Sequence, residues 1–185
     1  TVTNTVGSYS AQVRANPDAG FSIVKYTYSS TGTVGHGLNA QPHMIISKPA
    51  TQSGTWYVYH NSLGYHSAVY LDSNATAAGT STMNSTDPTT TVFTTNNWNP
   101  GENLVFCFAP IEGYSKFGKY IGNGSQDGTF VYCGFRPAFI LFKNTTHVAQ
   151  WLILDTVRDT YNLATKHLLP SLANSEASSA MADIL

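Results

Sequence analysis

The chain has 185 residues and a mass of 20.0 kDa, which is enough for one ordinary domain or two small domains that share a core. Its net charge of −1 excludes the basic surface that nucleic-acid binding needs, and no apolar stretch is long enough to insert into a membrane. Hydrophobic residues make up 42% and charged residues 10%, which excludes a disordered charged tail. Two cysteines, Cys107 and Cys133, are too few for a disulfide scaffold, and we expect both to be core thiols.

Short apolar runs recur along the chain, separated by turn-forming Gly, Asn, Ser, Thr and Pro residues. The runs cover residues 21–28, 44–46, 56–59, 68–71, 91–93, 104–108, 129–132, 139–142 and 151–154. Each is rich in aromatic or β-branched side chains, which favour strands, whereas the best helix candidates are only 163–168 and 173–181. The pattern predicts an all-β fold, an antiparallel β-sandwich of the jelly-roll or concanavalin-like kind.

Three sequence blocks occur twice in the same order, which indicates an internal duplication with a period of about 95 residues. The matched blocks are Gly20-Phe21-Ser22 with Gly113-Tyr114-Ser115, the run from Pro42 with the run from Pro137, and the run from Trp56 with the run from Trp151. Shared strand composition would also explain some of these matches. We expect a lead-in segment at 1–19, a first β repeat at 20–112 and a second at 113–185. The last strands of the second repeat are missing, so the chain continues or another chain supplies them.

Several motifs resemble one known domain family. They are Val13-Arg14-Ala15-Asn16-Pro17, Gly35-His36-Gly37-Leu38, Trp56-Tyr57-Val58-Tyr59-His60, Gly134-Phe135-Arg136-Pro137 and, most specific, the block at 112–124. With them the chain resembles DUF7483, an uncharacterised domain of tailed-phage structural proteins, often found with concanavalin-like or LamG-like modules in marine phage fibres. The resemblance covers nearly the whole chain and carries over no catalytic residue. It implies a surface-exposed virion component that binds other virion proteins and forms a homo-oligomer, a trimer by analogy with fibres.

Candidate catalytic and metal-binding residues are few. Asp155 and Asp159 are the closest carboxylates, and a glycosidase needs two carboxyl groups about 5 to 9 Å apart. A turn held by Arg158 explains the same residues, and we favour that interpretation. The histidines have no metal-site spacing, and His36, which lies between two glycines, is expected to cap a loop through its ring nitrogens. We therefore predict no enzymatic activity, no catalytic residue, no metal and no cofactor.

Aromatic side chains beside neutral polar groups are typical of surfaces that bind sugars or other proteins. Because alternate residues of a strand point to opposite faces, about half of the strand aromatics belong to the core. We expect Trp56 to be buried there, and the pattern leaves Tyr59 open. Loop aromatics are better candidates for a binding surface, and the predicted binding residues are Tyr65, Trp98 and Tyr161.

Together these features predict a structural component of a tailed-phage virion, such as a tail fibre or another surface-exposed appendage. Binding to a glycan on the host surface is part of this hypothesis. Two alternatives remain open. One is a capsid-decorating or head-fibre protein, and the other is a polysaccharide-degrading enzyme that uses Asp155 and Asp159.

Overall fold

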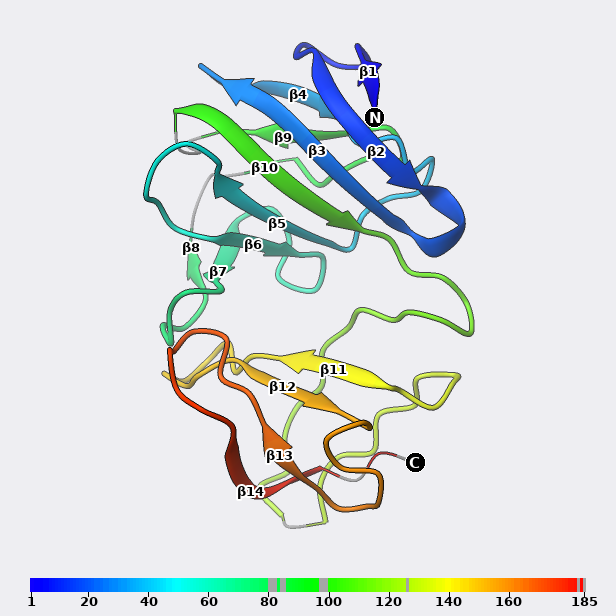
Figure 1. Ribbon diagram of the computed structural model, residues 1–185, viewed down its shortest axis with the longest axis vertical. Coiled ribbons are helices and arrows are strands. Elements are labelled where there is room, and N and C mark those ends of the chain that lie inside the picture. Colours follow the sequence, from blue (N-terminus) through cyan, green and yellow to red (C-terminus); the bar gives the residue numbers. More distant parts are fainter. Residues whose placement is uncertain (80–82, 84–85, 97–99, 126, 183, 185) are drawn as a thin grey trace. The chain divides into compact units, whose positions relative to one another are not determined.

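The structure is a computed structural model of the chain, and it describes residues 1–79, 83, 86–96, 100–125, 127–182 and 184. These residues form an all-β molecule with antiparallel sheets, as the sequence predicts (Figure 1). The strands are β1 (Val2–Asn4), β2 (Ala11–Asn16), β3 (Phe21–Tyr28), β4 (Gly32–Gly35), β5 (Met44–Pro49), β6 (Tyr57–His60), β7 (Ser67–Tyr70), β8 (Ala78–Gly79), β9 (Val92–Thr95), β10 (Gly101–Phe108), β11 (Phe139–Phe142), β12 (Leu152–Asp155), β13 (Ala164–His167) and β14 (Ala177–Ala182). A single-turn 3-10 helix, η1 (Pro17–Ala19), precedes β3. Within the described ranges, no helix has the length and apolar character needed to cross a membrane.

The main sheet contains eight strands in the order β1-β2-β3-β10-β5-β6-β7-β8. Strand β10 pairs with β3 on one side and β5 on the other, so that Val105 lies between Val24 and Ser47. The strand pairs β4–β9, β11–β12 and β13–β14 form three small sheets. The chain divides into two compact units. The first unit contains Thr1–Val69 and Ala78–Tyr120, and the second contains Tyr70–Ala77 and Ile121–Leu185.

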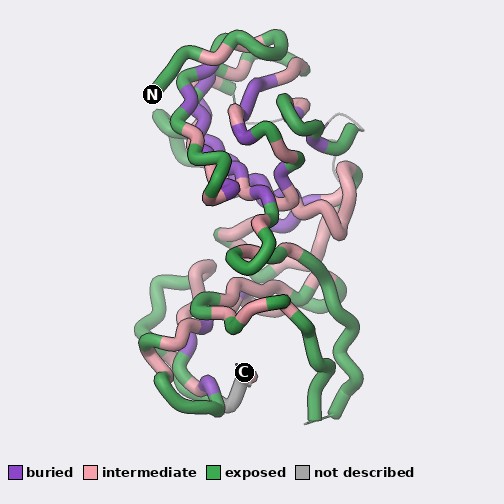
Figure 2. The backbone as a smooth tube through the Cα atoms, turned by 90° about the vertical axis from the view of Figure 1, so that its right-hand side faces the viewer, coloured by how far each residue is buried: buried purple, intermediate pink, exposed green. Residues whose placement is uncertain are grey.

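The core of the first unit lies between the main sheet and the β4–β9 pair. Alternate residues of β3 and β10, among them Val24 and Val105, are buried on the inner face, as a strand period of two requires. Val34 of β4 and Phe93 of β9 belong to the same cluster. Burial of each such side chain contributes about 1.5 to 3 kcal/mol, so this cluster is the main source of stability in the unit. Figure 2 shows the buried segments concentrated here.

The core of the second unit is smaller. Among the described residues, Leu154, Ala164 and Ile184 form its buried cluster, and Ile140 and Phe142 pack partly against it. Many large apolar side chains of this unit are exposed, namely Ile121, Phe130, Val131, Tyr132, Phe139, Val148, Val157, Tyr161, Leu163 and Leu172. The unit therefore buries less apolar surface around its strands than the first unit does.

Two hairpins have the same pairing register at a constant spacing in the sequence. Met44 of β5 pairs with His60 of β6, and Phe139 of β11, 95 positions later, pairs with Asp155 of β12, also 95 positions later. The three other residue pairs of each hairpin follow the same spacing. The backbone agrees beyond the strands, since the Asn61 N–H donates to the His43 carbonyl at 2.8 Å and the Thr156 N–H donates to the Ala138 carbonyl at 3.1 Å.

The predicted strands at 21–28, 104–108 and 139–142 are confirmed, and the other predicted runs lie within a residue or two of strands, with one exception. Residues 129–132 form no strand, and Phe130 and Tyr132 are exposed. The predicted helices at 163–168 and 173–181 are wrong, because β13 and β14 lie there and pair with each other. Helix propensity is a weak signal, and pairing that buries Ala164 and His167 outweighs it.

The predictions that Trp56 and Cys133 lie in the core are wrong, and the structure decides the open case of Tyr59. Tyr59 is the core residue, at 3% exposed, and its hydroxyl donates to Asp87 Oδ1 at 2.9 Å. Trp56 lies just before β6 and is half-buried, with Lys48 Nζ 5.0 Å from its ring centroid. Both thiols are free, but only Cys107 is a core residue, and Cys133 is half-buried.

Candidate functional site

The loop between β12 and β13, residues 156–163, is the candidate site because it holds exposed apolar side chains in a braced backbone. Val157 and Tyr161 are each 86% exposed, and Leu163 is 41% exposed. Several exposed apolar side chains on one loop make it a candidate binding surface. Hydrogen bonds fix the loop at its start, its middle and its end.

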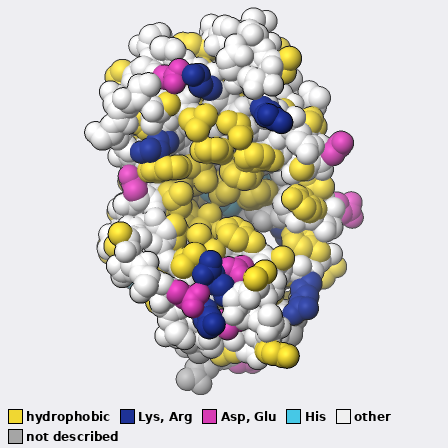
Figure 3. Space-filling view, viewed as in Figure 1, with side chains coloured by type: hydrophobic (Ala, Val, Ile, Leu, Met, Phe, Trp, Pro, Cys, Tyr) yellow, Lys and Arg dark blue, Asp and Glu magenta, His cyan; other side chains and the backbone are white. Residues whose placement is uncertain are grey.

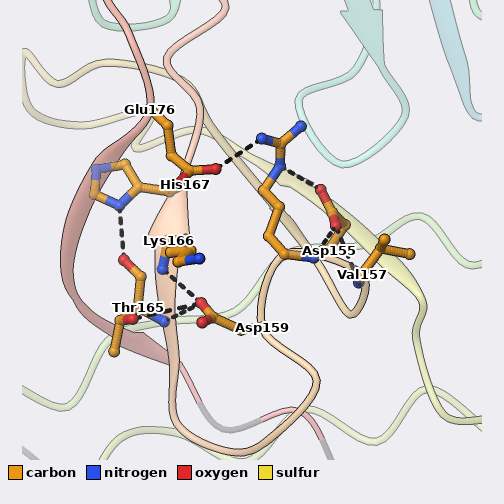
Figure 4. A network of polar contacts seen from close by, with 8 residues as sticks. Asp155, Val157, Asp159, Thr165, Lys166, His167 and Glu176 are labelled. Carbon is orange, nitrogen blue, oxygen red and sulfur yellow. Dashed lines mark hydrogen bonds and ion pairs between the residues drawn. The ribbon is translucent and has the colours of Figure 1, made fainter.

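Asp155, the last residue of β12, fixes the start of the loop. Its Oδ1 accepts hydrogen bonds from the backbone N–H groups of Val157 at 3.1 Å and Arg158 at 2.9 Å. Its Oδ2 forms an ion pair with Arg158 Nε at 2.6 Å, and Arg158 Nη1 extends to Glu176 Oε2 at 2.9 Å (Figure 4). The preferred interpretation of these residues, a turn held by Arg158, is confirmed.

Asp159 fixes the second half of the loop to β13. Its Oδ2 accepts hydrogen bonds from the backbone N–H groups of Thr165 at 2.7 Å and Lys166 at 2.6 Å (Figure 4). At the end of the loop, Asn162 Oδ1 accepts a hydrogen bond from the backbone N–H of Ile184 at 3.0 Å. Ile184 belongs to the small core, so the loop is tied to the most buried part of its unit.

The electrostatics of the two aspartates match this structural role. The backbone N–H of Arg158 holds the pKa of Asp155 below its usual range, and the backbone N–H of Lys166 does the same for Asp159. A general acid needs a raised pKa to carry a proton at neutral pH, and neither carboxyl group has one. Asp155 and Asp159 are therefore ionised carboxylates. They hold the loop in place by accepting hydrogen bonds from its backbone and from β13.

Two of the three predicted binding residues lie within the described ranges, one in each unit. Tyr161 lies on the braced loop. Tyr65 is half-buried, packs against the core of the first unit and contacts the ring of His66 at 4.1 Å between centroids. Trp98 lies outside the described residues. The sequence analysis did not identify Val157 as exposed. It also did not predict the ion pair between Arg158 and Glu176, because spacing alone does not predict a contact across eighteen residues.

His36 caps a loop, as the sequence predicts. Its Nδ1 accepts a hydrogen bond from the backbone N–H of Leu38 at 3.2 Å, and its Nε2 lies 3.2 Å from the carbonyl of Thr89, to which it donates. Burial lowers the pKa of His36, so the ring is neutral. Across the described part of the chain, no group of three or more His, Cys, Asp or Glu residues is placed to hold a metal ion.

A second surface feature lies on the outer face of the main sheet. Phe21 and Ile23 of β3 and Phe106 and Phe108 of β10 are half-buried there. The ring of Phe21 lies 4.9 Å from that of Phe108, centroid to centroid, and Phe108 also contacts Phe117. Figure 3 shows hydrophobic side chains gathered over β3, β10 and β5.

Comparison with known families gives one assignment. A family model described as a domain of unknown function, DUF7483, matches residues 1–185. The chain belongs to the DUF7483 family. No curated protein and no solved structure matches it. The braced loop and the apolar sheet face are thus features of a DUF7483 domain, and the family description assigns no activity to either.

Proposed function

We propose that this DUF7483 chain is a structural module of a tailed-phage virion, located in a tail fibre or another surface-exposed appendage and without an enzymatic role. The observation that carries the proposal is the braced loop, in which five polar side chains (Asp155, Arg158, Asp159, Asn162 and Glu176) hold the backbone that carries the exposed Val157 and Tyr161. A surface of this kind suits recognition, because a rigid loop loses little conformational entropy on binding. The resemblance of its motifs to tailed-phage domains supports the setting.

We also propose that the fold is a jelly-roll or concanavalin-like sandwich with an internal duplication. The β4–β9 pair, which shares a core with the main sheet, supports the sandwich. The matched registers of β5–β6 and β11–β12 support the duplication, because two unrelated hairpins would share neither the spacing nor the flanking hydrogen bond.

Assembly with other virion proteins, and with copies of the same chain, is part of the proposal. The apolar outer face of the main sheet supports it, because contiguous apolar surface on a folded protein commonly marks an interface. A trimer is the expected oligomer by analogy with fibres. Sedimentation of the full chain would measure the oligomeric state directly.

The proposed ligand of the braced loop is a glycan on the host surface. Aromatic rings stack on the apolar face of a sugar, and Tyr161 presents a flat ring together with a hydroxyl group. Neutral hydrogen-bonding residues are abundant in the chain and suit a ligand rich in hydroxyl groups.

Two measurements test the proposal. Gold-labelled antibodies against the chain are expected at tail tips or fibre ends of purified particles, whereas label spread over the shell would favour capsid decoration. Label on cells with none on particles would refute a virion role. In glycan screening, Y161A is expected to lose binding, and Y132A is the matched control because Tyr132 is also exposed, at 72%.

A further inference from the structure

The outer face of the main sheet changes from apolar to polar at strand β2. One row of paired residues crosses three strands there, from Arg14 of β2 through Ile23 of β3 to Phe106 of β10. The neighbouring row repeats this order, polar on β2 and apolar on β3 and β10, with Asn16, Phe21 and Phe108. Apolar residues and hydrogen-bond donors therefore meet along one line of the sheet.

A pocket lies at this line. It has a volume of about 420 Å³ and is lined by Arg14, Ala15, Asn16, Pro17, Phe21 and Ile23. All of these residues belong to the first unit. Sites for small molecules have volumes of about 300 to 1,000 Å³ and combine apolar walls with a few polar groups that orient the ligand. The size and lining of this pocket fit that description.

The polar side of the pocket consists of donors without partners. Arg14 is exposed, and its guanidinium group has no hydrogen bond or ion pair within the described ranges. Asn16 Oδ1 accepts a hydrogen bond from the Ala19 N–H at 3.3 Å, whereas its Nδ2 donates to no described residue. Because a guanidinium group and an amide Nδ2 donate and do not accept, this side of the pocket favours an anionic acceptor.

The charges of the outer face favour a ligand of the same sign. By alternation along the strands, the charged residues on this face of β2, β3, β10 and β5 are Arg14, Lys25, Glu102 and Lys48. The Glu102 carboxylate is paired with Lys25 Nζ at 2.8 Å. Asp18, the acidic residue nearest to Arg14 in the sequence, does not line the pocket. Figure 3 shows Lys and Arg side chains at the border of the hydrophobic surface.

We propose that this pocket binds a medium-chain fatty acid, whose carboxylate contacts Arg14 and Asn16. Its alkyl chain lies on Ile23, Phe21 and Phe106, a track that crosses strands spaced about 4.8 Å apart. An extended peptide needs hydrogen-bond partners along its whole backbone, which these apolar side chains cannot supply, whereas an alkyl chain needs none. The inference goes beyond the virion role and does not depend on it.

The test compares three probes by calorimetric titration into the full chain, below the concentrations at which they form micelles. Decanoate carries both parts of the ligand, decyltrimethylammonium carries the same chain with the opposite charge, and acetate carries the carboxylate alone. We expect saturable binding of one decanoate per chain, binding of the decyl cation that is weaker by about fivefold or more, and no measurable binding of acetate. Shifts in the amide NMR spectrum should map decanoate to residues 14–17, 21–23 and 106.

Two variants separate the charge from the apolar surface. R14M should weaken decanoate binding by about fivefold and remove the preference for decanoate over the decyl cation. I23T should weaken binding of both decyl compounds alike, because it changes the apolar surface and leaves the charge. R136M is the matched control for R14M, since Arg136 is also an exposed arginine but belongs to the second unit. Equal losses in R14M and R136M, or NMR shifts outside the pocket, would overturn the assignment.

Other results would identify a different occupant. Equal affinity for decanoate and the decyl cation would mean that the apolar surface adsorbs any chain without help from Arg14, and would refute the site. Dimers in sedimentation that exclude decanoate would show that a second copy of the chain covers the pocket, and would refute it as well. Absence of saturable binding would also refute it, while leaving the gold-label and glycan tests of the virion proposal unaffected.

Discussion

The hairpins β5–β6 and β11–β12 have the same register but different surroundings. Ile45 and Tyr59, which face each other in the first hairpin, are 1% and 3% exposed. Their counterparts Ile140 and Leu154 also face each other, but only Leu154 is buried. The first hairpin has β10 and a large core beside it, whereas the second has a small core and, in the described ranges, an open edge.

The two hairpins show that the local sequence pattern specifies the register, whereas the surrounding strands specify the burial. The alternation of residues and the length of the connection set the register of each hairpin. Burial depends on the strands and side chains packed around it, which lie far away in the sequence. Matched substitutions in the two regions therefore measure the contribution of the neighbours alone.

The largest expected difference is between the matched glycines, Gly20 and Gly113. Both have a positive φ, 62° and 73°, which L residues rarely adopt. A Cβ at position 20 would also clash with the carbonyl oxygen of Ala109, whereas a Cβ at position 113 meets nothing within 4 Å. Thermal or urea unfolding should show a loss of about 3 to 5 kcal/mol for G20A and about 1 kcal/mol for G113A.

Equal losses for the two glycine variants would contradict this prediction, because they would mean that backbone strain alone sets the cost. The Gly20 carbonyl accepts a hydrogen bond from the Ala109 N–H at 2.7 Å, so the end of β10 cannot move away freely. That contact is the reason for expecting the larger loss at Gly20.

The matched isoleucines should differ next. I45A removes a side chain from the main core and should cost about 2 to 4 kcal/mol. I140A removes a half-buried side chain and should cost about 1 kcal/mol. Unfolding curves measured on each variant give both values. Equal costs for the two variants would contradict the difference in burial between Ile45 and Ile140.

Much of the fold could be predicted from the sequence because most strands carry continuous apolar runs. Strand β11 was predicted with its observed bounds, since Phe139 and Phe142 enclose a run without polar residues. The strands β13 and β14 were mistaken for helices, because Ala, Ser and Lys have no strong strand preference and only pairing selects the conformation. The strand order could not be predicted from the sequence. Strand β10 lies between β3 and β5, which precede it in the chain by many residues.

The site was predicted only in part. Tyr161 was a candidate because it is a loop aromatic, and the turn held by Arg158 follows from a carboxylate three residues earlier. The contact of Arg158 with Glu176 and that of Asn162 with Ile184 depend on chain folding and leave no local signal. These long-range contacts make the loop rigid, so the property that supports recognition was the part that the sequence did not reveal.

Mild acid should affect the two hairpins differently. Burial lowers the pKa of His60 in the first hairpin, so its unfolded form binds a proton more readily than its folded form, and stability falls as pH drops below about 6.5. Its counterpart Asp155 has a lowered pKa because of the Arg158 N–H, so its contribution persists until the pH falls below about 3.8. Hydrogen exchange at pH 7, 5 and 3.5 should show β6 losing protection first.

The H60N variant tests the cause of that loss. In the unchanged chain, His60 Nδ1 accepts a hydrogen bond from the Ser62 N–H at 3.2 Å. The side-chain oxygen of asparagine can accept the same hydrogen bond, but asparagine does not titrate. Between pH 7 and 5, the free energy of unfolding should therefore fall less steeply for the variant than for the unchanged chain. The two slopes should differ by up to about 1.4 kcal/mol per pH unit. His36 and His43 also have pKa values lowered by burial, so some dependence should remain. A slope equal to that of the unchanged chain would exclude His60 as a contributor.

The smallest effect concerns the two thiols and leaves stability unchanged. Cys107 on β10 is fully buried, and burial raises the pKa of its thiol to about 12, so the reactive thiolate is scarce. Cys133 in the second unit is half-buried, and its Sγ lies 3.7 Å from the Val131 carbonyl in an exposed segment. Brief maleimide treatment of the folded chain should therefore label Cys133 alone, and mass spectrometry of fragments identifies the site. Labelling of Cys107 at a similar rate would mean that β10 opens as readily as the segment around Cys133, which would contradict the contrast in burial between the two thiols.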